Sequence, residues 1–205
     1  MAAILTPDME SLRLIVGLGN PGAKYAKTRH NVGFQLVERL AKQWQVGWTT
    51  EKKFQSNVAR VERNGVPVIL CEPQTYMNVS GEAVGALVSF YRVPLTQVVV
   101  AVDDADLPLG QIRMRMRGSS GGHHGLESIE KHLGTSDFAR LRIGIGRAAD
   151  GQRQIANYVL APFEATEAVL VDKVITVASE QIECWLSAGI EKAMSQFNGV
   201  VKDSA

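Results

Sequence analysis

The chain has 205 residues, 45% of them hydrophobic, a length that favours one well-buried globular domain over two. Its formal charge of +1 excludes a strongly basic protein, so a polyanion would have to bind local clusters of positive charge. No apolar segment approaches the roughly 18 residues of a membrane span, and the two cysteines suit a reducing cytoplasm. We expect a cytoplasmic protein without a membrane segment, in which residues 12–200 form the domain and residues 1–11 a disordered extension.

The first predicted strand, over residues 12–18, leads into a glycine turn. The glycine spacing in residues 17–22, GLGNPG, matches the fingerprint of dinucleotide-binding proteins, in which a helix begins inside the turn and faces the phosphates. Pro21 removes one of the N–H donors, and the segment that should supply a second strand with an acidic end has a helical pattern instead. The turn therefore points away from a nucleotide and leaves the role of Asn20 to be explained.

Helical periodicity begins near Asn31, a possible N-cap, and predicts a helix over residues 31–44. His30 directly precedes this helix. Because the positive end of a helix disfavours the protonated imidazole, His30 is a candidate general base. The alternative is a partly exposed polar residue beside a helix cap.

The pair Asn64-Gly65 is typical of a two-residue hairpin turn and predicts a hairpin whose second strand covers residues 66–71. A helix is predicted over residues 79–91, and Asn78 stands at its start, where it could act as a cap. Its amide could instead bind a peptide backbone, with Met77 as an apolar wall.

The most apolar strand is predicted over residues 98–103 and ends at Asp103. A carboxylate at the end of a buried strand can orient the imidazole of a catalytic histidine. The neighbouring aspartates lack the glycine and final glutamate of a calcium loop, so a metal site is the minority interpretation. Since the sequence has no G-x-S-x-G motif and no activated cysteine, the nucleophile of a hydrolytic site would most simply be water.

Residues 112–117 alternate apolar and basic side chains, which predicts a strand with its three arginines on one face. The glycine-rich loop that follows would let a phosphate approach the next predicted helix, over residues 125–133. A second basic cluster, which includes Arg142, overlaps a strand predicted over residues 141–146. Clustered arginines suit phosphates, and a solvated edge strand protected by charge is the alternative.

Strands interleaved with helices, the last of them in residues 164–195, indicate an α/β fold, and the hairpin makes the sheet mixed. We expect a single-domain three-layer α/β/α sandwich with a twisted mixed β-sheet. Sites in such sheets collect beyond the carboxyl ends of parallel strands. We therefore expect Asn20, Asp103 and the loop at residues 118–125 to form one site.

Five segments resemble, in the same order, the motifs of the bacterial peptidyl-tRNA hydrolase family. They are VGLGNPGAKYAKTRHNVGF, QTYMNVSGEAV, DDADLPLGQIRMR, GSSGGHHGLESI and RLRIGIGR, and the resemblance spans about residues 12–195. It implies a tRNA-binding enzyme that hydrolyses the ester between a peptide and the 3′-terminal ribose of peptidyl-tRNA and so recycles tRNA. It implies no metal or organic cofactor, and a monomer.

The resemblance also implies catalytic roles. His30 would be the base that activates water, and Asp103 would position its imidazole. Asn20 would orient the substrate or stabilise the developing oxyanion, which gives the polar residue of the glycine turn a function. Tyr25 is similar to the family's residue near the terminal nucleotide.

Further positions of the resemblance concern binding. Met77 and Asn78 look like contacts to the peptide, and Arg115 and Arg142 match basic positions associated with tRNA phosphates. His124 is a substrate-contact position at which the chain departs from the family, which usually has Asn there.

Two other functions compete with the hydrolase. One is a non-catalytic RNA-binding relative of the same fold, and the presence of His30, Asp103 and Asn20 argues against it. The other is a nucleotide-dependent oxidoreductase, which rests only on the glycine spacings that begin at Gly17 and Gly144.

Overall fold

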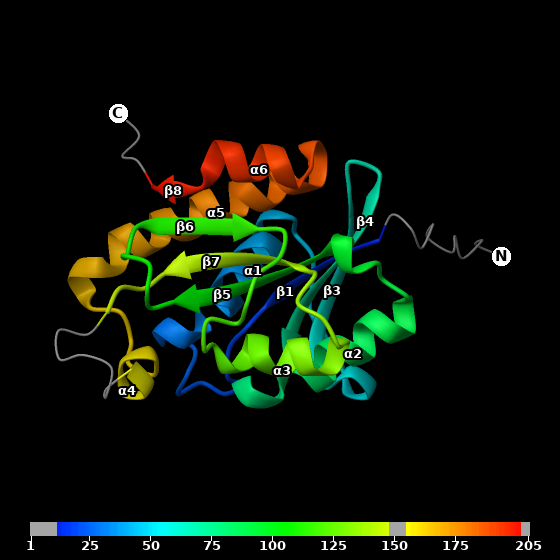
Figure 1. The fold of residues 1–205 in the computed structure, drawn as a ribbon, viewed down its shortest axis with the longest axis horizontal. Helices are drawn as coiled ribbons and strands as arrows, with labels where there is room; N and C mark the ends of the chain where they lie inside the picture. Colours follow the sequence, from blue (N-terminus) through cyan, green and yellow to red (C-terminus); the bar gives the residue numbers. More distant parts are fainter. Residues whose placement is uncertain (1–11, 148–154, 202–205) are drawn as a thin grey trace.

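A computed structural model of the protein describes residues 12–147 and 155–201. In these ranges the chain forms an eight-stranded sheet in the order β2-β3-β4-β1-β5-β7-β6-β8, with helices on both faces (Figure 1). The strands are β1 (Arg13–Gly17), β2 (Thr49–Glu51), β3 (Ser56–Arg63), β4 (Val66–Pro73), β5 (Val98–Asp104), β6 (Gln111–Arg115), β7 (Ala139–Gly144) and β8 (Gly199–Val200). The helices are α1 (Val32–Gln43), α2 (Ser80–Tyr91), α3 (His124–Leu133), α4 (Ile155–Val159), α5 (Ala168–Ala188) and α6 (Ile190–Phe197).

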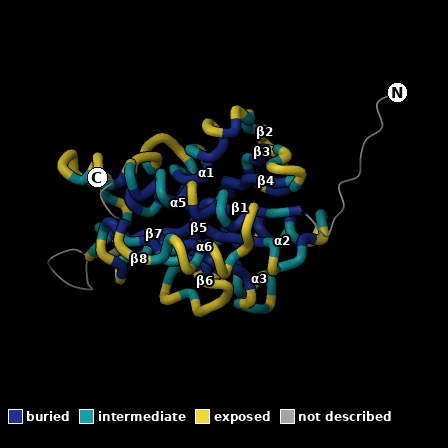
Figure 2. Tube along the Cα trace, turned by 90° about the horizontal axis from the view of Figure 1, so that it is seen from above, coloured by how far each residue is buried: buried dark blue, intermediate teal, exposed yellow. Residues whose placement is uncertain are grey.

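Two apolar cores lie on opposite faces of the sheet, because successive side chains of a strand point to opposite sides. On β1, Ile15 packs with α1, α5 and α6, whereas Leu14 and Val16 pack with α2 and α3. The central strands β1, β5 and β7 are buried, as Figure 2 shows, which explains their continuous apolar sequences. The predicted three-layer sandwich is confirmed.

The central strands β4, β1, β5 and β7 run parallel, and the outer pairs run antiparallel. The predicted mixed sheet and its hairpin are therefore confirmed. Asn64 and Gly65 both have positive φ angles, 52° and 77°, as a type I′ turn requires, and Arg63 pairs with Val66 across it.

The glycine turn after β1 is shaped by close packing. A Cβ on Gly17 would lie 2.2 Å from the carbonyl oxygen of Gly33, and one on Gly19 would lie 2.7 Å from the ring of Phe34. Glycine therefore lets α1 pack directly against the end of β1. Because α1 begins at Val32, well after the turn, its N–H groups do not open into the turn as a dinucleotide site requires.

Several predicted boundaries are wrong. The helix predicted over residues 164–195 is interrupted at Gly189, whose φ of 83° ends α5 and lets α6 pack back on it. The strand predicted over residues 112–117 ends at Arg115, so Arg117 lies beyond it. β2, β8 and α4 have five residues or fewer, too few for a sequence period to reveal them. The predicted extension at residues 1–11 lies outside the described residues.

A buried acid in the sheet links stability to pH. Glu72 of β4 is 5% exposed, its Oε1 has no hydrogen-bond partner in the described part of the chain, and its Oε2 lies 3.4 Å from the amide nitrogen of Asn57. Burial first, and then the negative charge of Glu38 on α1, raise the pKa of Glu72 from 4.5 to about 7. The folded protein therefore prefers the protonated acid.

This preference predicts the direction of the pH dependence. The unfolded chain releases the Glu72 proton at lower pH than the folded chain, so the free energy of unfolding should fall between about pH 4.5 and about pH 7, by up to about 3 kcal/mol. Glu72→Gln keeps the shape without the charge, so it should stabilise the protein more at pH 8 than at pH 4. Urea unfolding at the two pH values measures this difference.

The matched control is Glu62→Gln, which changes an exposed acid on the neighbouring strand β3. It should leave the pH dependence of unfolding as in the unaltered protein. If Glu72→Gln also leaves it unchanged, Glu72 does not carry the linked proton.

Candidate active site

The predicted site residues from distant segments meet in one open pocket beyond the carboxyl ends of β1 and β5. Its volume is about 750 Å³. The predicted residues that line it are Asn20, His30, Met77, Asn78, Asp103, His124 and Arg142. The structure thus joins the glycine turn, the end of β5 and the glycine-rich loop before α3, whereas Tyr25 and Arg115 lie outside the pocket lining.

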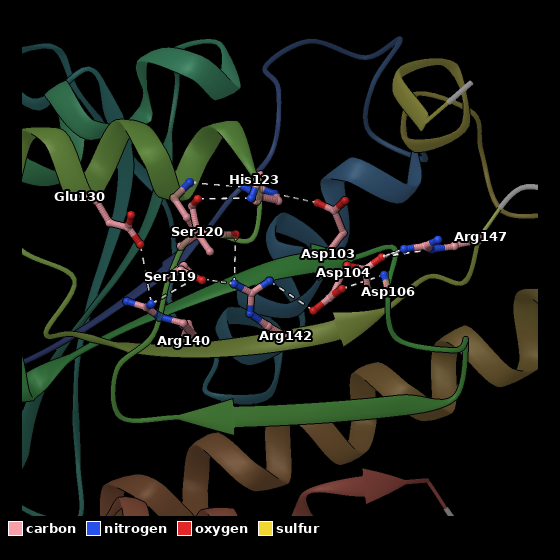
Figure 3. Close-up of polar contacts among 12 residues, drawn as sticks. Asp103, Asp104, Asp106, Ser119, Ser120, His123, Glu130, Arg140, Arg142 and Arg147 are labelled. Atoms are coloured by element: carbon pink, nitrogen blue, oxygen red, sulfur yellow. Dashed lines mark hydrogen bonds and ion pairs between the residues drawn. The ribbon is translucent and has the colours of Figure 1, made fainter. Parts of the chain in front are cut away.

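Asp103 is the centre of the site. It is 4% exposed, and its Oδ1 lies 2.8 Å from Nδ1 of His30 and 3.1 Å from Nε2 of His123 (Figure 3 shows the His123 contact). Burial alone raises the pKa of Asp103, but the attraction of the two imidazoles and their hydrogen bonds outweigh it and hold the pKa well below the usual range. Asp103 is therefore an ionised acceptor at any working pH.

The hydrogen-bond partners assign the tautomers of both rings. Nδ1 of His123 accepts the backbone N–H of Leu126 at 3.3 Å, which makes His123 the N-cap of α3 and places its proton on Nε2, toward Asp103. His30 donates Nδ1–H to the same carboxylate oxygen. The Nε2 atom of His30 is then left with its lone pair, and the side chain lines the pocket. This nitrogen is suited to accept a proton.

Among the described residues, one cluster has ligand atoms close enough to hold a metal ion, and it consists of the two histidines and Asp103. The ligand atoms of His30, Asp103 and His123 lie within 4.8 Å of one another. A ligating Nε2 of His123 would need its proton on Nδ1, where the N–H of Leu126 already donates. The arrangement fits a hydrogen-bonded cluster better than a set of metal ligands.

Asn20 is held by two neighbours. Its backbone N–H donates to Oδ1 of Asn31 at 2.9 Å, and its carbonyl accepts from Nδ2 of Asn31 at 2.9 Å. Its side-chain Oδ1 accepts the N–H of Met77 at 2.8 Å, and within the described ranges no residue accepts a hydrogen bond from its Nδ2. Asn31 therefore fixes the turn and does not cap α1 with its side chain, contrary to the sequence prediction.

Met77 and Asn78 belong to a 3₁₀ turn before α2. Met77 is buried, and a Cβ on Gly125 of α3 would lie 2.6 Å from its sulfur, so glycine is required for this packing. Asn78 is exposed and makes no capping bond, because α2 begins two residues later. Tyr76, absent from the predicted site, lines the pocket with 59% of its surface exposed.

The glycine-rich loop is tied to the sheet by two arginines (Figure 3). Arg142 donates to the carbonyls of Ser119 at 2.8 Å and Ser120 at 3.0 Å and pairs with Asp104 at 3.2 Å. Arg140 is fully buried and lies 3.5 Å from the Ser119 carbonyl. Arg142 thus lines the pocket while its guanidinium is hydrogen-bonded to the loop and to Asp104. The basic pattern of its strand did not reveal these bonds.

Three other predicted residues lie at the edge of the site or away from it. Arg115 is exposed at the end of β6 and has no hydrogen bond or ion pair to the described residues. His124 is 74% exposed along its side chain and lies 3.1 Å from a carboxylate oxygen of Glu127. Tyr25 is half-buried, with the ammonium of Lys24 4.6 Å from its ring.

A further part of the pocket wall comes from α4 and the residue that follows it. Ala156, Val159 and Leu160 line the pocket, whereas no residue of α5 does. Together with Tyr76, His123 and this wall are parts of the site that sequence reasoning missed. The position of His123 between a glycine loop and a helix start was the available signal.

Within the described residues, no helix is long and apolar enough to cross a membrane.

Comparisons with known proteins agree on one family. The family model described as peptidyl-tRNA hydrolase matches residues 14–204. The peptidyl-tRNA hydrolase of Carboxydothermus hydrogenoformans is 49% identical over 90% of this chain and 97% of its own length, and that of Synechocystis sp. is 47% identical over 91% and 95%. The crystal structure of the Acinetobacter baumannii peptidyl-tRNA hydrolase aligns with a TM-score of 0.88 and 37% identity over 94% of this chain and 97% of that chain. The chain belongs to the peptidyl-tRNA hydrolase family.

Proposed function

We propose that this protein hydrolyses the ester between a peptide and the 3′-terminal ribose of peptidyl-tRNA and so returns free tRNA. The observation that carries the proposal is the bond from His30 to the ionised Asp103, which leaves Nε2 of His30 unprotonated in the pocket. Family membership supplies the class of substrate.

The chemistry needs a base, an oxyanion site and an acid. Nε2 of His30 takes a proton from water as the water oxygen attacks the ester carbon, and ionised Asp103 stabilises the imidazolium that forms. Nδ2 of Asn20 donates to the developing oxyanion. The bond between the carbon and the ribose oxygen then breaks, and the imidazolium returns its proton to that oxygen. The products are a peptide carboxylate and a tRNA with a free 3′ end.

His123 acts in this scheme as a positioning residue. Its Nε2–H donates to Oδ1 of Asp103, the oxygen that also accepts from His30. Because Nδ1 of His123 is fixed by α3, the carboxylate is held from two sides. A carboxylate that cannot turn keeps the His30 ring in one orientation. A base held in the reactive orientation raises the rate of hydrolysis.

Different residues of the site would bind the peptide and the tRNA parts of the substrate. Met77 and Asn78 would contact the peptide, and Tyr76 and Tyr25 offer aromatic faces for a terminal base. The remaining predicted contacts, His124, Arg115 and Arg142, surround the glycine-rich loop and would face the tRNA. Phosphate contacts carry no sequence information, which suits an enzyme for many tRNAs.

The alternatives have less support. A non-catalytic RNA-binding relative would not need an imidazole fixed by an ionised buried carboxylate. The glycine spacings that suggested an oxidoreductase are explained by packing, since a Cβ on Gly144 would also lie 2.1 Å from the carbonyl oxygen of Pro108. Because one chain supplies all the groups of the site, we propose a monomer, acting in the cytoplasm where peptidyl-tRNA forms.

The direct test of the activity compares two esters of one tRNA. N-acylated aminoacyl-tRNA should be cleaved and free aminoacyl-tRNA largely spared, because the free ester carries an ammonium that is costly to desolvate beside the ester. Acid-precipitable label measures both reactions. Cleavage of neither ester, or of both at equal rates, would contradict the proposed function.

His30→Ala removes the base and no proposed tRNA contact. We expect kcat for N-acylated aminoacyl-tRNA to fall by about 10²-fold or more and the Kd for uncharged tRNA to stay unchanged. Single-turnover cleavage and filter binding measure the two effects. A kcat close to that of the unaltered enzyme would remove His30 from the mechanism.

Asp103→Asn keeps the shape of the acceptor but removes its negative charge. Its amide oxygen can still accept both imidazole N–H groups, but it no longer stabilises the imidazolium that forms at His30, so kcat should fall by about 10²-fold to 10⁴-fold with a smaller change in KM. His123→Asn, which still offers an acceptor to α3, should lower kcat less. An effect of Asp103→Asn on KM alone would make Asp103 a substrate contact.

Arg115 and Arg142 should respond differently to substitution. Arg115→Gln removes an exposed charge, so it should reduce the salt dependence of tRNA binding by about one unit or less and leave kcat unchanged. Arg142→Gln should also lower kcat, because it releases the carbonyls of Ser119 and Ser120 in the loop before His123. Equal effects of the two variants on kcat would show that the loop does not depend on Arg142.

A further inference from the structure

Arg29 is a buried arginine that the mechanism above does not use. It directly precedes His30, is 4% exposed, and donates to the carbonyl of Pro162 and, at 2.7 Å, to Oε2 of Glu167. The guanidinium also lies 4.4 Å from the ring centroid of Tyr158 and 5.1 Å from that of Phe163. A planar guanidinium can make these contacts at once because its N–H groups point outward while its faces remain free for rings.

The backbone around Arg29 reinforces the connection. The N–H of Arg29 donates to the carbonyl of Ala161 at 3.0 Å, and Thr28 forms an isolated antiparallel bridge with Pro162. At the other side of the segment, the hydroxyl of Tyr158 donates to the carbonyl of Ile145 at 2.7 Å. Residues 158–163 are therefore held between the His30 segment and the chain after β7.

The segment that Arg29 holds carries the apolar wall of the pocket. Val159 and Leu160 face the same pocket as His30, and Leu160 is 41% exposed although it is apolar. Buried Met77 also lines this pocket. An apolar side chain presented to a pocket gains free energy when an apolar ligand group covers it.

We propose that Arg29 is a positioning residue that holds this wall, and that Val159 and Leu160 bind the apolar side chain of the peptide residue joined to the ribose. The proposal rests on the proposed hydrolysis of peptidyl-tRNA and adds a preference among peptides. The preference comes from Val159 and Leu160, and Arg29 makes it depend on the segment that also carries the catalytic histidine.

The test compares N-acetyl-leucyl and N-acetyl-glycyl esters of the same tRNA. Leu160→Ser should lower kcat/KM for the leucyl ester about tenfold and that for the glycyl ester by less than about twofold. Arg29→Lys should reproduce this selective loss, because an ammonium cannot bridge Pro162 and Glu167 as a guanidinium does. Arg39→Lys is the matched control, since Arg39 donates to Thr176 and Asp172 of α5.

Amide hydrogen exchange gives a second readout that needs no substrate. Residues 158–163 should exchange faster in Arg29→Lys than in Arg39→Lys or the unaltered protein. An unchanged ratio of leucyl to glycyl cleavage in active Leu160→Ser overturns the peptide preference. Equal loss for both esters in Arg29→Lys, or unchanged exchange, overturns the positioning role. Failure of the unaltered enzyme to cleave either ester would instead contradict the proposed function, and the peptide preference with it.

Discussion

A single carboxylate oxygen, Oδ1 of Asp103, receives N–H groups from two imidazoles, and the geometry of the site depends on it. Both N–H groups favour the ionised carboxylate, and the two rings keep Asp103 ionised despite its burial. Because His123 is bound on its other side by α3, it cannot turn away. His30 is then the ring with a nitrogen left for chemistry.

Close packing between α1 and the sheet places His30 beside Asp103. Gly17 and Gly33 let α1 and the end of β1 touch, and a Cβ on Gly33 would lie 2.4 Å from the carbonyl oxygen of Ala101 in β5. The start of α1 is thereby placed over β5, the parallel strand that carries Asp103. Arg29 connects the same segment to Ala161 and Pro162, which follow α4, so the base and the apolar wall share one support.

Much of the fold follows from local sequence, since buried parallel strands need continuous apolar runs and the Asn64-Gly65 turn has a specific backbone requirement. Side-chain partners depended on tertiary structure. Asn31 has the sequence position of a cap, yet its amide is taken by the turn. Arg142 has the pattern of a solvated charge, yet it holds carbonyls of the loop. The spacing of apolar and polar residues in the sequence does not show which partner each of these side chains binds.

The two tautomers that share the Asp103 carboxylate can be observed by nitrogen NMR of the histidine rings. At about pH 8, above the usual range of histidine titration, we expect His30 protonated on Nδ1 and His123 protonated on Nε2. His30 protonated mainly on Nε2, or His123 mainly on Nδ1, would contradict this assignment, because Asp103 could not then accept from both rings.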